Sequence, residues 1–401
     1  MIMKKHICVV GLGYIGLPTA SLLATKGYQV IGVDINPAVV ESINGGKVHI
    51  VEPDLDVLVR SAVNSGNLQA APEPTEADIF ILSVPTPFVG DHVPDTSYVE
   101  AATRAICPHL RTGNLVILES TVPVGTTETV VARTIQAMCP ELAGEIAIAH
   151  CPERVLPGQI LRELIENDRV VGGIDTMSTE MAAAFYQEFV SGEVLATDAR
   201  TAEMAKLTEN SYRDVNIAFA NELSMICDDL DINVWDMIRL ANRHPRVNIL
   251  SPGPGVGGHC IAVDPWFIVS SAPEQSRLIR TAREVNDDKP LWVLNKVREK
   301  AARFKHPVIG CLGVTFKADI DDLRESPAME IARALMQDPG LEVLINDPYV
   351  SATTEFDNLP LADVLAGADI LLFLVDHKPY RKLSAAHLKE KIVIDTRGML
   401  A

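Results

Sequence analysis

Residues 7–16 read Ile7-Cys8-Val9-Val10-Gly11-Leu12-Gly13-Tyr14-Ile15-Gly16. The apolar run predicts a short buried strand, and the glycines that follow have the spacing Gly-x-Gly-x-x-Gly. In such a turn the first glycine permits a tight bend, the second lets the backbone approach a pyrophosphate, and the third lets helix and strand pack closely. The stretch therefore predicts the strand–turn–helix unit of a dinucleotide-binding sheet, with Gly11, Gly13, Tyr14, Ile15 and Gly16 beside the cofactor.

A carboxylate stands where such a site needs one. Asp34 ends the second predicted strand, Gln29–Val33, about 20 positions beyond the central glycine. A carboxylate there accepts hydrogen bonds from the ribose hydroxyls and repels a 2′-phosphate, so the pattern favours NAD over NADP. The alternative is an ordinary glycine-rich turn, and the position of Asp34 weighs against it.

Two further turns follow later strands of the same predicted sheet. Val84-Pro85-Thr86-Pro87 comes after the strand Ile79–Ser83, and Ser120-Thr121-Val122-Pro123 comes after Leu115–Glu119. Ligands of open α/β sheets bind at the carboxyl ends of the strands. We therefore expect Thr86 and Thr121 near NAD or the reacting group, although simple turn chemistry is an equal alternative.

The pattern of elements divides the chain into three domains. Residues 1–192 alternate strands with helices, which predicts an N-terminal Rossmann dinucleotide-binding domain. Residues 193–244 contain no glycine or proline, and we expect one helix capped by Thr201 and a second capped by Asn233 within a central helical segment, 193–300. Residues 301–401 return to alternation, with strands at 308–312, 342–345, 370–375 and 392–395, and predict a C-terminal Rossmann-like α/β domain.

Composition excludes several function classes. The 401 residues carry a net charge of −18, which argues against nucleic acid as a partner. The longest apolar run is too short for a membrane span, and no targeting segment is visible. Seven scattered cysteines without metal-ligand spacing predict reduced thiols, no bound metal and a cytoplasmic location.

A polar stripe is expected on the first helix of the central segment. Its members lie at steps of three, four and three, which puts them on one helix face: Glu203, Lys206, Asn210 and Arg213. A solvated face with ion pairs is the usual explanation for such charges. Asn210, which has an uncharged amide, fits that explanation poorly, and the set also suits a negatively charged ligand.

The stretch Pro252-Gly253-Pro254-Gly255-Val256-Gly257-Gly258-His259-Cys260 is the most unusual in the chain. Glycines let backbone pass close to a ligand, and a cysteine that follows them is exposed to that ligand. A dehydrogenase needs a thiol when it oxidises an alcohol beyond the aldehyde, because a thiohemiacetal can lose a second hydride to become a thioester. A buried structural cysteine is the alternative. Asp264, four residues later, could cap the next helix.

These motifs together resemble the UDP-glucose/GDP-mannose dehydrogenase family, whose members include UDP-sugar 6-dehydrogenases. The resemblance covers nearly the whole chain, through the glycine turn, the Cys260 loop, Phe316-Lys317 and Asp322-Leu323-Arg324-Glu325-Ser326. Members that act on UDP-N-acetyl-D-mannosamine (UDP-ManNAc) are the most similar, in the stretches 150–158, 206–210 and 242–250. The resemblance implies NAD as cofactor, a homodimer built on the central segment, and UDP binding by the C-terminal domain.

The resemblance also implies roles for individual residues. The catalytic positions are Cys260 as nucleophile, Lys206 for proton transfer, and Asn210, Asp264, Glu153 and Thr121. The substrate positions are Arg154, Val155, Lys206, Asn210, Arg213, His244, Arg246, Gly257, Phe316, Lys317 and Arg397, and Arg324 is placed with the cofactor. Without the resemblance, Lys317 and Arg324 could equally be ordinary surface charge.

One departure from the pattern of glucose-type members bears on the class of sugar. Glucose-type members resemble Pro-Glu-Phe-Leu-Arg-Glu-Gly, whereas this chain has Pro152-Glu153-Arg154-Val155-Leu156-Pro157-Gly158. The change argues against UDP-glucose and suits an acetamido sugar. The preference for UDP-ManNAc rests on the resemblance alone, which implies its four-electron oxidation with two NAD, for a bacterial surface polysaccharide. UDP-N-acetylglucosamine (UDP-GlcNAc) stays open as a substrate. A two-electron hydroxyacid dehydrogenase and a non-enzymatic NAD-binding regulator are remote alternatives.

Overall fold

The structure is a computed structural model that describes residues 5–90, 92–258, 260–351 and 353–400. It divides into two compact units. Unit 1 is Met1–Thr208 with Trp266–Ala272, and unit 2 is Glu209–Pro265 with Pro273–Ala401. The boundary between them falls inside one long helix, so that helix contributes residues to both units.

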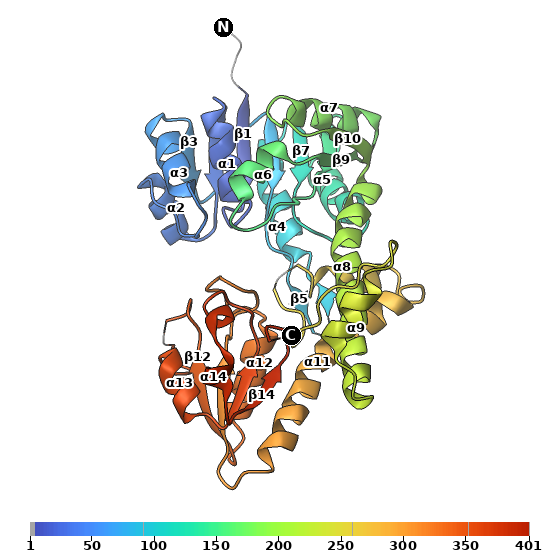
Figure 1. The fold of residues 1–401 in the computed structure, drawn as a ribbon. Coiled ribbons are helices and arrows are strands. Elements are labelled where there is room, and N and C mark those ends of the chain that lie inside the picture. The colour runs from blue at the N-terminus through green and yellow to red at the C-terminus, as the bar shows by residue number, and fades with distance from the viewer. Residues whose placement is uncertain (1–4, 91, 259, 352, 401) are drawn as a thin grey trace. The chain divides into compact units, whose positions relative to one another are not determined.

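Unit 1 is built on a sheet of eight strands (Figure 1). Their order across the sheet is β10-β9-β8-β7-β4-β1-β2-β3, and every pairing is parallel except that of β8 with β9. The strands are β1 (His6–Val10), β2 (Gln29–Val33), β3 (Leu68–Ala71), β4 (Ile79–Leu82), β7 (Leu115–Leu118), β8 (Ala147–His150), β9 (Arg169–Gly173) and β10 (Val194–Asp198). A small antiparallel hairpin pairs β5 (Phe88–Val89) with β6 (Val93–Pro94).

Helices cover both faces of this sheet, because its central strands are apolar on both sides. Every residue of β4 and β7 is buried. One core packs α1, α3, α6 and α7 onto one face, and the other packs α4, η2 and α5 onto the opposite face. The helical elements are α1 (Gly16–Thr25), α2 (Pro37–Asn44), α3 (Leu55–Asn64), α4 (Ser97–Ile106), η1 (Cys107–His109), η2 (Thr127–Ala132), α5 (Arg133–Met138), η3 (Pro140–Leu142), α6 (Ile160–Glu166) and α7 (Thr176–Gln187). The predicted doubly wound dinucleotide-binding fold is confirmed.

Unit 2 combines long helices with a second sheet, whose four strands run parallel in the order β12-β11-β13-β14. Its strands are β11 (Val308–Leu312), β12 (Glu342–Asn346), β13 (Ile370–Phe373) and β14 (Ile392–Asp395). Its helical elements are α9 (Val234–Ala241), α11 (Arg277–Ala301), α12 (Pro327–Met336), α13 (Leu361–Gly367), η4 (Tyr380–Lys382) and α14 (Ala385–Leu388). Two helices cross the unit boundary, α8 (Ala199–Asp229) and α10 (Asp264–Ser271). The expected C-terminal Rossmann-like sheet is confirmed.

The helix caps differ in one place from the expectation. Helix α8 begins at Ala199, before Thr201, because the carboxylate of Asp198 accepts hydrogen bonds from the Thr201 backbone N–H at 2.9 Å and from its hydroxyl at 2.6 Å. The prediction that Thr201 caps this helix was therefore wrong, and Asp198 is the capping side chain. Asn233 caps α9 as expected, because its side chain accepts hydrogen bonds from the backbone N–H groups of Trp235 and Asp236.

None of the helices in the described ranges has the length and apolar character to cross a bilayer.

Candidate active site

The glycine turn joins β1 to α1 in unit 1. Gly11 adopts a φ of +94°, and a Cβ there would meet the carbonyl oxygen of Ser83 at 2.4 Å. A Cβ on Gly16 would lie 1.8 Å from the carbonyl oxygen of Gly11. Gly13, in contrast, faces open space, with nothing within 4 Å of a Cβ in the described structure. Two glycines are thus required by the protein itself, and the third leaves room for a pyrophosphate at the start of α1.

Asp34 lies beside this turn. Its carboxylate accepts hydrogen bonds from the backbone N–H groups of Leu12, at 3.1 Å, and Asn36, at 2.9 Å. Both bonds fix the carboxylate at the end of β2, in the position where a dinucleotide presents its ribose hydroxyls. Tyr14 is 40 % exposed at the same turn. The residues present therefore fit an adenine dinucleotide.

The two threonine turns contact each other at the ends of their strands. The hydroxyl of Thr86 donates a hydrogen bond to the carbonyl oxygen of Thr121 at 2.6 Å. Ser120 bridges the same two turns, because its hydroxyl donates to Val84 O at 2.7 Å and accepts from Val84 N at 3.0 Å. The carboxyl ends of β4 and β7 therefore form one connected surface on unit 1.

A buried cluster of ionisable groups lies next to these strand ends. The Glu153 carboxylate pairs with the Arg169 guanidinium at 2.7 Å, and both side chains are almost fully buried. Glu119 accepts a hydrogen bond from the Tyr186 hydroxyl at 2.9 Å, while its Oε2 has no hydrogen-bond partner in the described residues. Burial, followed by the negative charge of Glu153, raises the pKa of Glu119 to about 7. Sequence reasoning singled out Glu153 here but missed Arg169 and Tyr186.

The neighbouring residues of the Glu153 loop are more exposed. The backbone N–H of Arg154 donates to Glu153 Oε1 at 2.7 Å, and its guanidinium donates to the carbonyl oxygen of Asp168 at 3.2 Å. Val155 is half-buried against the core of unit 1. This loop therefore turns Glu153 inward and leaves Arg154 at the surface.

The polar stripe on α8 is split between the two units. Glu203 is buried in unit 1, where its carboxylate accepts hydrogen bonds from the backbone N–H groups of Gly125 and Thr127 and from the Thr127 hydroxyl. The side chain of Glu203 therefore holds the start of η2, and the interpretation of Glu203 as part of a ligand-binding stripe was wrong. Lys206 is half-buried, and Arg213 is exposed.

The remaining residue of the stripe, Asn210, is connected to Cys260 by hydrogen bonds. Asn210 donates a hydrogen bond to the Asp264 carboxylate at 2.5 Å. The backbone N–H of Asp264 in turn donates to the carbonyl oxygen of Cys260 at 2.9 Å. Cys260 is exposed, whereas the other six cysteines are buried. Within unit 2 the structure therefore links Asn210, Asp264 and Cys260 through a short series of hydrogen bonds. Asp264 is the first residue of α10, and its carboxylate serves this link.

The glycines before Cys260 are explained by contacts within unit 2. A Cβ on Gly253 would meet the Arg397 guanidinium at 2.5 Å, and one on Gly257 would meet the Glu325 carbonyl oxygen at 2.1 Å. A Cβ on Gly258 would lie 3.0 Å from the Phe316 ring. The sequence argument expected these glycines to approach a ligand. The structure shows that they admit residues of the segments that follow β11 and β14. His259 lies outside the described residues.

The remaining predicted substrate positions are placed as follows. Lys317 and Arg324 are exposed on the segment after β11, and Arg324 makes a two-point contact with Asp322, at 2.9 and 2.6 Å. Arg397 follows β14, and its guanidinium contacts Asp376 at 3.0 Å. His244 and Arg246 are exposed on the turn after α9. These residues lie in unit 2, whereas the cofactor turn, Thr86, Thr121 and Glu153 lie in unit 1.

Comparison with known families assigns all three parts of the chain. Residues 5–190 match the NAD binding domain of the UDP-glucose/GDP-mannose dehydrogenase family, residues 200–288 match its central domain, and residues 310–401 match its UDP binding domain. The chain belongs to the UDP-glucose/GDP-mannose dehydrogenase family. It is accordingly an NAD-dependent oxidoreductase with a UDP-binding C-terminal domain, which confirms the predicted family and cofactor.

Individual members of this family are similar over almost their full length. The chain is 58 % identical to an NDP-N-acetyl-D-galactosaminuronic acid dehydrogenase of Ralstonia nicotianae, over 98 % of this chain and 96 % of the relative. It is 53 % identical to the UDP-N-acetyl-D-mannosamine dehydrogenase of Escherichia coli, over 98 % of both chains. A solved UDP-N-acetyl-mannosamine dehydrogenase from S. aureus superposes with a TM-score of 0.89 at 43 % identity, covering 98 % of this chain and 95 % of that one.

Proposed function

We propose that the protein oxidises the C6 primary alcohol of UDP-ManNAc to a carboxylate, in two steps that use two NAD, and that Cys260 is the nucleophile. The observation that carries the proposal is the hydrogen-bonded series from Asn210 through Asp264 to the backbone of the exposed Cys260. The Asn210 amide and the Asp264 carboxylate are thus joined to the residue that carries the exposed thiol, and such groups are suited to orienting a carbonyl group and moving protons around it.

The proposed reaction assigns one role to each group. Lys206, one helical turn before Asn210, takes the proton of the C6 hydroxyl as the alcohol becomes an aldehyde. The Cys260 thiolate then adds to the aldehyde carbon, and Asn210 stabilises the oxygen that becomes negative. Loss of a proton and a second hydride turns this thiohemiacetal into a thioester, and water releases the acid and restores the thiol. NAD, when bound, accepts the hydride in both oxidations.

The other predicted residues fit this scheme by their chemistry. Glu153 and Thr121, on the strand-end surface of unit 1, are proposed to hold the attacking water or the reacting oxygen. The cations of unit 2 are proposed to bind the pyrophosphate and sugar, because guanidinium and ammonium groups pair well with phosphate. These cations are Arg213, Arg246, Lys317 and Arg397. His244, Phe316 and Gly257 are proposed to lie beside them, with Arg324 toward NAD.

The choice of sugar is supported by the names of the relatives. Relatives at 53–54 % identity are named for UDP-N-acetyl-D-mannosamine, and relatives at 58 % identity are named for N-acetyl-D-galactosaminuronic acid. Both names describe a 2-acetamido sugar. UDP-ManNAc is the primary proposal, and UDP-N-acetylgalactosamine (UDP-GalNAc) is the second candidate that the more identical relatives favour. The uronic acid would then be consumed in assembling a surface polysaccharide.

A panel of UDP-sugars tests the substrate. We expect kcat/KM for UDP-ManNAc to exceed that for UDP-glucose at least tenfold, because a site with polar groups for an acetamido substituent leaves them unpaired when the substituent is missing. NADH formation is measured with UDP-ManNAc, UDP-GlcNAc, UDP-GalNAc and UDP-glucose under identical conditions. Preference for UDP-GalNAc would replace the primary sugar by the second candidate. Equal values for UDP-ManNAc and UDP-glucose would remove the acetamido proposal.

The working unit is proposed to be a homodimer built on α8. Three large apolar side chains on this helix are exposed and recur every seven residues: Tyr212, Phe219 and Ile226, at 69, 53 and 44 % exposure. Such a stripe is the expected contact face of a paired helix.

The cytoplasm is the proposed location. This proposal is supported by the cysteines, because all except Cys260 are buried and none of the seven forms a disulfide, as is usual in a reducing compartment.

A charge in this stripe tests the dimer. We expect the unaltered protein to sediment as a dimer at micromolar concentration, and Phe219→Glu to sediment as a monomer, because a carboxylate would be buried without a partner. Glu222→Gln, an exposed change on the same helix, is the control and should remain dimeric. A fully active monomer of the unaltered protein would refute the dimer.

A further inference from the structure

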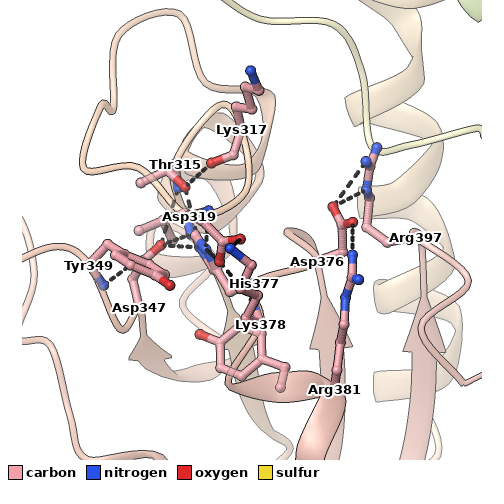
Figure 2. Close-up of polar contacts among 12 residues, drawn as sticks. Thr315, Lys317, Asp319, Asp347, Tyr349, Asp376, His377, Lys378, Arg381 and Arg397 are labelled. Carbon is pink, nitrogen blue, oxygen red and sulfur yellow. Dashed lines mark hydrogen bonds and ion pairs between the residues drawn. The ribbon is translucent and has the colours of Figure 1, made fainter. Parts of the chain in front are cut away.

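Three consecutive residues after β13 contact two other segments, residues 314–319 after β11 and the segment with Arg397 after β14. The proposed function places both segments at the substrate. Asp376, His377 and Lys378 follow the end of β13, and His377 is completely buried. Figure 2 shows the His377 ring at the centre of a polar cluster, with Asp376 beside it contacting Arg381 and Arg397. The residues of this turn therefore connect the segment after β11 with the segment after β14.

The hydrogen bonds of His377 indicate which ring nitrogen carries the hydrogen. Its Nδ1 accepts a hydrogen bond from the backbone N–H of Asp319 at 2.9 Å. A backbone N–H can only donate, so Nδ1 carries no hydrogen and the ring hydrogen is on Nε2. That nitrogen lies 3.1 Å from the Asp347 carboxylate and 3.3 Å from the Thr315 hydroxyl oxygen. The Thr315 hydroxyl gives its own hydrogen to the Lys317 carbonyl oxygen at 2.9 Å, so it can accept from His377.

Asp347 completes the attachment of the segment. Its carboxylate accepts hydrogen bonds from the backbone N–H groups of Val314, at 2.8 Å, and Thr315, at 3.3 Å. Burial alone would raise the pKa of Asp347, but the bonds from His377 and the backbone outweigh burial and lower it. Asp347 is therefore a carboxylate that holds the beginning of the segment, while His377 holds its end at Asp319.

The segment held in this way carries two predicted substrate contacts. The Phe316 ring packs on Gly258, two residues before Cys260. The Lys317 side chain is exposed and extends away from the cluster in Figure 2. On the other side of the turn, Asp376 orients the Arg397 guanidinium, which lies against Gly253 at the start of the cysteine loop. A displacement of His377 would therefore reach both the proposed phosphate-binding groups and the loop of the nucleophile.

We propose that His377, in its Nε2–H form, is a positioning residue that fixes the Phe316–Lys317 segment for UDP binding. The inference rests on the proposed function, which assigns UDP to this segment. The most important contact is the hydrogen bond that Nδ1 accepts from Asp319, because this bond fixes the position of the backbone two residues after Lys317. The bond to Asp347 keeps the ring in the required orientation and leaves Nδ1 as the acceptor.

Two substitutions separate these bonds. In His377→Asn the amide oxygen occupies the place of Nδ1 and still accepts from Asp319, while the contact with Asp347 is lost. In His377→Gln the amide nitrogen reaches the place of Nε2 and still donates to Asp347, while the Asp319 N–H loses its acceptor. Both variants remove a buried ring and should lower the thermal midpoint. UDP affinity, measured by calorimetry well below that midpoint, should weaken roughly tenfold in His377→Gln and no more than about threefold in His377→Asn.

Leu335→Ala is the matched control. Leu335 is fully buried on α12 in the core of the same sheet and belongs to neither segment. This variant should lower the thermal midpoint without changing UDP affinity. Equal UDP affinity in His377→Gln and the unaltered protein would overturn the proposal. Equal weakening in both histidine variants would also overturn it, because a purely structural role predicts no difference between them. If the unaltered protein binds UDP but oxidises no UDP-N-acetylhexosamine, the proposed function fails while the order of the UDP affinities still decides the role of His377.

Discussion

Replacing Cys260 by serine is expected to reduce overall turnover by about a thousandfold or more while NAD and UDP-sugar still bind. A cysteine thiol, with an ordinary pKa of ~8.5, supplies some thiolate near neutral pH, whereas a hydroxyl supplies almost no alkoxide. The first hydride leaves from an alcohol and needs only a base. The second must leave from a covalent adduct, which the hydroxyl forms poorly, so any slow product should stop at the aldehyde or an ester.

The measurement is NADH counted per sugar consumed, combined with the intact mass of the quenched protein. The unaltered protein should give two NADH per sugar and a transient adduct on Cys260. Cys107→Ser is the control, because Cys107 is buried and its thiol donates to the Thr103 carbonyl oxygen at 3.2 Å, a bond that serine can reproduce. Uronic acid formed by Cys260→Ser at close to the unaltered rate would disprove the covalent mechanism.

The central strands of both sheets could be predicted from the sequence because their residues are buried on both faces. Strand β11 begins and ends at the predicted residues, Val308–Leu312, and β4 and β7 each end one residue before the predicted end. Strands β3, β9 and β10 of the first sheet were not predicted. Strand β10 is at most half-buried along its length, and β9 begins with an arginine and ends with two glycines. Local sequence carries little β pattern in such strands, and their pairing partners decide the structure.

The site could be predicted where chemistry depends on neighbours in sequence. The glycine turn, Asp34 and Cys260 can each be recognised from the residues that precede or follow them in the sequence. The reason for the glycines at 253–258 could not be found that way, because the groups that press on them come from residues 316–327 and 397. Burial of Glu203 was hidden for the same reason, since its hydrogen-bond donors lie near residue 125, on another element.

The charge state of the buried cluster could not be predicted from local sequence either. This cluster consists of Glu119, Glu153 and Arg169. An arginine at the start of an apolar strand, as in Asp168-Arg169-Val170-Val171, is an available signal of a buried charge partner. It does not reveal that a second carboxylate, that of Glu119, is buried near this ion pair. Arg169 pairs directly with Glu153, so the positive charge in contact with the cluster balances one carboxylate and leaves Glu119 to keep its proton.

Glu119→Gln is therefore expected to stabilise the protein above pH 7 and to leave its stability unchanged near pH 4.5. The pKa of Glu119 rises from an ordinary value of 4.5 to about 7 on folding. Between these values the unfolded chain releases a proton that the folded chain retains, so stability falls as pH rises and is lowest above pH 7. The shift corresponds to a cost of about 3 kcal/mol at high pH, at 1.36 kcal/mol per unit. Glutamine removes the titration, and its amide oxygen can still accept from Tyr186.

Thermal midpoints of the two proteins, measured from pH 4.5 to pH 8, test this expectation. The midpoint of the unaltered protein should fall more steeply with pH than that of the variant, so that the two curves diverge as pH rises. Glu141→Gln, a change at an exposed position on η3, is the control and should follow the unaltered curve. A constant difference between Glu119→Gln and the unaltered protein across the whole range would mean that Glu119 is already ionised in the folded state. In that case the buried cluster would carry a net negative charge, and Arg169 alone would have to stabilise two carboxylates.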